Sequence, residues 1–235
     1  MLLRLFDVRK IVLLIQCYFI IFVLFLQPLS THAQQTIFNV PSADVTERGM
    51  IFFQHQSSFS NEFANFDNNF VYGLGKNTEF DLTLFGVGTK SIRNEILAPG
   101  FKTVIPIFEK SKTKITFGHL IPISLIGKGI GGYTYSHVST IVPKTKTRIT
   151  SGIAIGTEVL FGRDFVSYVG ALEQPITRKL SLAVEWYSGK HANGFLIPGF
   201  YYHVSPKFIL SAAYKIRNNH GNGHNGFIIE LSKFF

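Results

Sequence analysis

The feature that most restricts the fold is an alternation of apolar and polar residues in a long series of short segments after residue 48. Side chains point to opposite faces at successive positions of a β-strand, so a period of two predicts strands and argues against helices. We expect an all-β chain of about twelve strands, with 10–14 compatible with the pattern. The expected ranges are 49–59, 68–75, 78–88, 99–108, 113–124, 130–142, 147–160, 164–172, 179–187, 195–204, 207–217 and 225–235.

The two faces of each segment differ in polarity. One face of segment 179–187 carries Leu180, Leu182, Val184 and Trp186, and the other carries Ser181, Ala183 and Glu185. Segment 207–217 divides in the same way. This pattern suits a soluble barrel with its apolar face inward or a membrane barrel with its apolar face outward, and alternation alone does not decide between them.

The connections between these segments alternate in length. Short, often basic turns at 75–78, 109–112, 143–146 and 205–207 are interleaved with longer loops rich in Gly and Asn, such as 188–194 and 218–225. The loop at Gly162-Arg163 is an exception because it is too short. Unequal ends of this kind are typical of an up-and-down antiparallel barrel with both termini at the short-turn end.

Residues 1–33 have the composition of a secretory signal peptide. Basic residues precede an apolar run over 11–26, and Ala33 offers a cleavage site. An uncleaved anchor helix is the alternative, but this run is shorter than the ~20 residues that span a bilayer. Residues 34–48 then form a periplasmic lead-in, which either enters the lumen of the barrel or remains a flexible tail. The only cysteine, Cys17, lies before the cleavage site, so the mature chain has no disulfide, thiol chemistry or Cys-based zinc site.

The last segment has a distinctive spacing of glycine, aliphatic and aromatic residues. Gly226, Ile229, Leu231 and Phe235, preceded by His224, resemble the insertion signal of bacterial outer-membrane β-barrel proteins. The stretches 37–45, 84–87 and 173–189 also resemble uncharacterised, porin-like members of that group. This resemblance implies a transmembrane barrel over 49–235, with the apolar face toward lipid and a location in the bacterial outer membrane. It implies no substrate and no catalytic residues.

With this orientation, nine charged side chains are expected to face the lumen. They are Glu79, Asp81, Lys102, Arg148, Glu158, Glu185, Lys215, Arg217 and Glu230. Because charged side chains set the preference of a pore for ions and solutes, we predict a narrow passive channel for small polar solutes or ions. The same groups could instead pair and fill the lumen. A non-conducting structural or adhesive barrel is therefore the main alternative.

A lipid-modifying enzyme acting at the outer rim is a third interpretation. Ser188 and His191 share one loop, and Asp164 could lie near the same rim, but catalysis needs a Ser–His contact that the sequence does not establish. His220 and His224 flank a Gly-Asn-Gly turn, and two ligands are fewer than a typical metal site has. We therefore expect no enzyme, no catalytic residue, no metal and no cofactor.

The net charge is +9 and falls to +7 without residues 1–33, which remove three cations and one carboxylate. The cations are scattered over turns and form no block, so we expect no nucleic-acid partner. The expected partners are outer-membrane lipid and lipopolysaccharide, together with the barrel-assembly machinery during insertion. The sequence does not predict the oligomeric state.

Overall fold

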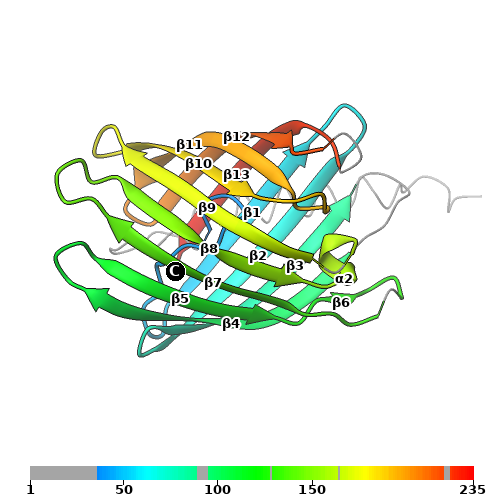
Figure 1. Cartoon of the computed structure of the whole chain (residues 1–235), viewed down its shortest axis with the longest axis horizontal. Helices are drawn as coiled ribbons and strands as arrows, with labels where there is room; N and C mark the ends of the chain where they lie inside the picture. The colour runs from blue at the N-terminus through cyan, green and yellow to red at the C-terminus, as the bar shows by residue number, and fades with distance from the viewer. Residues whose placement is uncertain (1–35, 89–94, 128, 164, 220–222) are drawn as a thin grey trace, which may run out of the picture.

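The chain folds into a closed, antiparallel, up-and-down β-barrel of twelve long strands (Figure 1). This computed structural model describes residues 36–88, 95–127, 129–163, 165–219 and 223–235. The strands are β1 (Ile51–Phe59), β2 (Ala64–Gly75), β3 (Thr78–Gly88), β4 (Ile96–Phe108), β5 (Thr113–Leu120), β7 (Tyr133–Ile141), β8 (Arg148–Gly156), β9 (Phe165–Pro175), β10 (Leu180–Tyr187), β11 (Phe195–Ser205), β12 (Phe208–Arg217) and β13 (Gly226–Phe234). A two-residue strand, β6 (Ile123–Ser124), pairs with β4 outside this ring.

The barrel closes by pairing its first strand with its last. Phe52 of β1 lies opposite Phe234 of β13, and the pairing continues to Phe59 opposite Phe227. Every other long strand pairs with its neighbours along the chain. Closure satisfies backbone N–H and C=O groups that a bilayer interior could not, which confirms the transmembrane barrel expected from the sequence.

All twelve expected strands are present, and the errors that change the type of element lie at the long-loop end, whereas at the short-turn end β1 begins at Ile51 rather than 49 and β9 ends at Pro175 rather than 172. The expected segment 113–124 is interrupted after Leu120, and Ile123–Ser124 forms β6. The expected segment 147–160 ends as a strand at Gly156, and residues Glu158–Phe161 form a one-turn helix, α2, that ends at Gly162 with φ 74°. Figure 1 shows α2 and β6 at the same end of the barrel. Among the described residues, no helix has the length and apolar character needed to cross a membrane.

The outer wall of the barrel is apolar and its inner wall is mixed. In β10, Leu182 and Trp186 are 48% and 42% exposed, whereas the alternate residues Ser181 and Glu185 are buried inside. The other strands repeat this arrangement, so large aliphatic and aromatic side chains cover the exterior. An exposed apolar surface of this extent is a lipid-facing surface, and the apolar-outward orientation follows.

The two ends of the barrel differ in backbone geometry as well as in loop length. Three lysines in the short turns, Lys76, Lys112 and Lys146, have positive φ angles of 51°, 46° and 62°. Glycine or asparagine normally occupies such positions. We call the rim that holds these short turns the short-turn end, and the opposite rim is the long-loop end.

Candidate functional site: the lumen and the segment that crosses it

Residues 36–48, which we call the inserted segment, lie inside the barrel. Ile37 and Phe38 are each 1% exposed and Val40 is fully buried, all three packed with inward side chains of the wall. The sequence left open whether this segment enters the lumen or stays outside, and the structure has it inside. Gly199 of β11 makes room for it, since a Cβ there would lie 2.6 Å from Cζ of Phe38.

The first anchor of the inserted segment is the carboxylate of Glu185 on β10. Three successive backbone N–H groups donate to it, from Phe38 at 2.9 Å, Asn39 at 2.8 Å and Val40 at 2.9 Å. Successive N–H groups that converge in this way form an anion-binding concavity. The buried carboxylate and the peptide N–H groups therefore satisfy one another.

The second anchor is an ion-pair cluster around Asp44. Arg148 of β8 donates to this carboxylate at 2.7 Å, and the ammonium group of Lys114 on β5 lies 3.2 Å from it. Lys114 also donates to the carbonyl oxygen of Ala43 at 3.0 Å. Burial by itself would raise the pKa of Asp44, but the charges of Arg148 and Lys114 and their hydrogen bonds outweigh burial and hold the pKa at about 2. Asp44 is therefore ionised at neutral pH.

The third anchor is Glu79 on β3. It accepts a hydrogen bond from the backbone N–H of Thr46 at 2.6 Å and forms an ion pair with Lys102 of β4 at 2.8 Å. Glu79 and Lys102 are opposite one another across the two strands, and both side chains are almost completely buried. The buried carboxylate is thus compensated by a cation and by the inserted segment.

The anchors show that the inserted segment crosses the lumen. Around the ring of twelve long strands, β3 is third and β10 is ninth, so the two are six positions apart and stand on opposite walls. The first anchor lies on β10 and the third on β3, with the second on β8 and β5 between them. The segment therefore spans the width of the barrel.

A cavity lies on either side of this crossing. The larger, about 530 Å³, is open toward the long-loop end, and Asn39 and Pro41 of the inserted segment form part of its wall. Asp67, Asp81 and Lys215 also line it. The smaller, about 340 Å³, lies at the short-turn end beside Arg148. Both linings are mixed, since charged and polar side chains lie beside apolar ones such as Phe85 and Phe195 in the larger cavity and Ile141 in the smaller.

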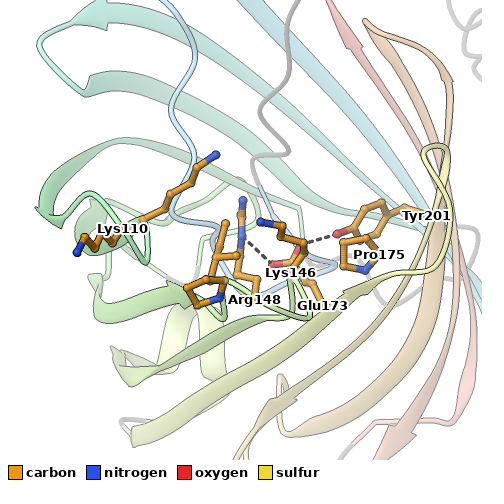
Figure 2. Close-up of a pocket in the computed structure, with 9 residues that line it drawn as sticks. Lys110, Lys146, Arg148, Glu173, Pro175 and Tyr201 are labelled. Atoms are coloured by element: carbon orange, nitrogen blue, oxygen red, sulfur yellow. Dashed lines mark hydrogen bonds and ion pairs between the residues drawn. The ribbon is translucent and has the colours of Figure 1, made fainter.

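The smaller cavity contains a connected set of polar side chains (Figure 2). The guanidinium Nε of Arg148 lies 3.7 Å from Oε1 of Glu173, and the hydroxyl of Tyr201 donates to Oε2 of Glu173 at 2.6 Å. Lys110 and Lys146 from two short turns reach the same cavity, as Figure 2 shows. Arg148 is therefore shared between Asp44 of the inserted segment and Glu173 of the wall.

The structure brings together four of the nine expected lumen charges at the inserted segment: Glu79, Lys102, Arg148 and Glu185. Asp81 and Lys215 line the larger cavity. Glu230 is buried on the inner wall of β13. Arg217 lies at the long-loop end of β12, where its guanidinium group donates to the carbonyl oxygen of Gly223.

The expectation for Glu158 was wrong. Because β8 ends two residues earlier, Glu158 lies in the first turn of α2 at the rim and is exposed. Three functional residues were missed: Asp44, Lys114 and Glu173. Strand alternation could have found two of them, since Lys114 shares its face with inward-facing Thr116 and Glu173 shares its face with inward-facing Ala171. Nothing in the sequence pattern of the lead-in marks Asp44.

Ser188 and His191 do not form the Ser–His pair that an enzyme would need. Nε2 of His191 is 2.8 Å from the backbone carbonyl of Ser188, and Nδ1 accepts the N–H of Asn193. The Ser188 hydroxyl oxygen instead accepts the N–H of Tyr168. The His191 ring stacks on Phe161 at 4.2 Å, which is a packing role. Asp164 and His220 lie outside the described residues, as does the expected signal peptide.

The apolar exterior, the closed ring and the lumen of mixed polarity define a transmembrane β-barrel of the porin-like fold. The chain is similar in structure to the KdgM porin in complex with disordered oligogalacturonate, with a TM-score of 0.61 and 7% identity over 79% of this chain and 99% of that one. It is also similar to the NanC porin, with a TM-score of 0.51 and 10% identity over 79% and 99% of the two chains. No protein-family model and no curated protein sequence matches the chain.

Proposed function

We propose that this protein is a narrow passive channel of the bacterial outer membrane for small polar solutes or ions, constricted by its own inserted segment. The observation that carries this proposal is the pair of cavities at opposite ends of one lumen, each with charged side chains in its lining, and the inserted segment between them. Displacement of thirteen residues, 36–48, would join two compartments that the wall already lines with polar groups.

The location rests on three features. A closed β-barrel with an apolar exterior suits an outer membrane, the sequence of residues 1–33 has an export-signal composition, and the last strand resembles a barrel insertion signal. The neighbours of similar fold are named porins. On this proposal the partners are outer-membrane lipid, lipopolysaccharide and the barrel-assembly machinery, and the protein is neither an enzyme nor a nucleic-acid-binding protein.

The test is conductance in a planar lipid bilayer, with the chain from residue 34 compared with a variant lacking residues 36–46. We expect small discrete steps from the intact chain and larger steps from the deletion variant. Heat-modifiable migration in electrophoresis serves as the control for folding of both. A folded deletion variant that carries no current contradicts the channel.

A non-conducting barrel is the second candidate, and one observation favours it. The inserted segment is held by Glu185, by Arg148 with Lys114 and by Glu79, which together fix it on opposite walls. On this alternative the segment is a permanent filler of the lumen. The variant lacking residues 36–46 would then either fail to fold or fold without conducting, whereas the channel proposal requires that this variant conducts.

A further inference from the structure

The smaller cavity at the short-turn end is surrounded by an excess of positive charge. Four cations line it, Lys110, Lys112, Lys146 and Arg148, against the single carboxylate of Glu173. The lining residues alone therefore carry a net +3 around about 340 Å³, and within that count the charge of Arg148 is already paired with Asp44. Cavities of roughly 300–1,000 Å³ are the usual size for small-molecule sites.

The cations of this cavity differ in how far they are compensated. Glu173 is already engaged by Arg148 and by the hydroxyl of Tyr201. Within the described part of the chain, the ammonium groups of Lys110, Lys112 and Lys146 form no ion pair. The positive charge of these three lysines at the cavity mouth therefore has no carboxylate partner among the described residues.

Two of these lysines have positive φ angles, a backbone conformation that is unfavourable for residues other than glycine and asparagine. Lys112 has φ 46° and Lys146 has φ 62°, in the region where glycine or asparagine is preferred. A strained position occupied by an unsuitable residue is a reason to look for a role of its side chain. Lys76 has the same geometry in another short turn but does not line the cavity, which makes it a natural control.

Arg148 already binds an anion of this chain. Its guanidinium group donates to Asp44 at 2.7 Å, and the Arg148 side chain also lines the cavity. Guanidinium groups have five N–H donors and bind carboxylates and phosphates through two of them at once. An anion entering the cavity would therefore meet the same cation that holds the inserted segment.

We propose that this cavity binds a small, soluble, multivalent oxyanion bearing phosphate or carboxylate groups, and that the bound anion competes with Asp44 for Arg148. Lys110, Lys112 and Lys146 supply the charge at the mouth, and Arg148 supplies the directed hydrogen bonds. The site does not depend on whether the barrel conducts. Its occupation weakens the second anchor of the inserted segment.

Isothermal titration calorimetry with inorganic pyrophosphate, on the chain from residue 34 folded in non-ionic detergent at low salt, tests the proposal. We expect one pyrophosphate per chain. The double variant Lys112→Gln/Lys146→Gln should bind roughly tenfold more weakly, because two charge-assisted contacts are lost. The control Lys76→Gln/Lys179→Gln carries the same charge change outside the cavity and should bind as the wild type does. Equal weakening in both doubles would overturn the site.

Competition is tested by Asp44→Asn, which should bind pyrophosphate roughly tenfold more tightly because Arg148 and Lys114 are released. Glu109→Gln removes one carboxylate from a turn at the same end without touching Arg148, and it should change the affinity little. Unchanged affinity in Asp44→Asn, or an equal gain in Glu109→Gln, would overturn the competition. Absence of binding to all variants would overturn the site itself.

A phospholipid headgroup carries the same chemistry as a soluble phosphate, so the titration is repeated in nanodiscs containing phosphatidylglycerol. Unchanged pyrophosphate affinity in the nanodiscs supports a soluble ligand. Loss of pyrophosphate binding would show that the lipid headgroup occupies the cavity, and it would overturn the proposal of a soluble ligand. Binding without bilayer current contradicts only the channel. Current without binding contradicts only this inference.

Discussion

At the scale of single residues, the lumen compensates its buried charges through the inserted segment as well as through its own wall. A buried carboxylate is costly unless hydrogen bonds or a cation satisfy it. Glu185 is only 1% exposed and receives its hydrogen bonds from peptide N–H groups of the inserted segment. Removing its charge should therefore act first on the inserted segment.

We expect Glu185→Gln to loosen the inserted segment, because one accepting oxygen and the charge are lost. Hydrogen bonds to charged groups contribute about 1.5–3 kcal/mol, so local opening should increase roughly tenfold or more. The chain after Cys17 has no other cysteine, so Ala43→Cys provides a single buried site for maleimide labelling. The labelling rate should rise in Glu185→Gln and stay constant in Glu230→Gln, a buried wall carboxylate outside the three anchors.

The depressed pKa of Asp44 predicts a pH dependence with a defined direction. Its pKa falls from 3.8 to about 2 in the folded protein, so its contribution is complete above pH 4 and disappears as the pH falls toward 2. This shift corresponds to about 2 kcal/mol. Labelling of the Ala43→Cys variant should accelerate over that interval. Asp44→Asn should remove this part of the pH dependence, and its persistence would assign the effect to another group.

At the scale of elements, alternation was sufficient for strands and insufficient for everything else. It predicted β10 and β12 almost to the residue because each has one lipid-facing and one inward face. It failed at α2, since one helical turn is too short to show a period. Alternation also could not predict that the inserted segment enters the lumen, because every residue type except proline has a backbone N–H group that can donate to a distant carboxylate.

The entry of the inserted segment depends on a glycine of β2. A Cβ at Gly73 would lie 1.9 Å from the carbonyl oxygen of Glu47. Because this oxygen belongs to the main chain, only a shift of the main chain could relieve the clash. We expect Gly73→Ala to destabilise the folded protein by about 1–3 kcal/mol, as overpacking does, and to accelerate labelling at position 43. Unfolding by urea measures the loss. Gly132→Ala is the control, since its Cβ would meet only His119 at 3.7 Å. Equal effects would contradict this contact.

At the scale of the whole molecule, the composition of the exterior decides the environment. Ile153 of β8 is 51% exposed near the middle of its strand, and Val166 of β9 is 61% exposed beside the long-loop rim. The sequence predicted this outward face from alternation together with the resemblance of its two ends to exported barrels. It could not predict how open the lumen is, because that depends on contacts between residues far apart.

A charge on the outer wall should be costly according to its depth. We expect Ile153→Arg to lower the stability of the barrel in lipid vesicles by about 2–4 kcal/mol, and Val166→Arg by about 0–1 kcal/mol. Urea titration of folding into vesicles measures both. Similar values for the two variants would contradict a bilayer centred on the middle of the strands.

The order of the anchors along the chain has a consequence for biogenesis. The inserted segment precedes every strand, yet each of its anchors joins residues that are far apart in the sequence. Thr46 and Glu79 are separated by 33 residues, Asp44 and Arg148 by 104, and Phe38 and Glu185 by 147. Contacts of such range form late, because the loops between them must be ordered first. The inserted segment is therefore the last part of the described chain to reach its native position, and the folding barrel passes through a hollow stage before its lumen is filled.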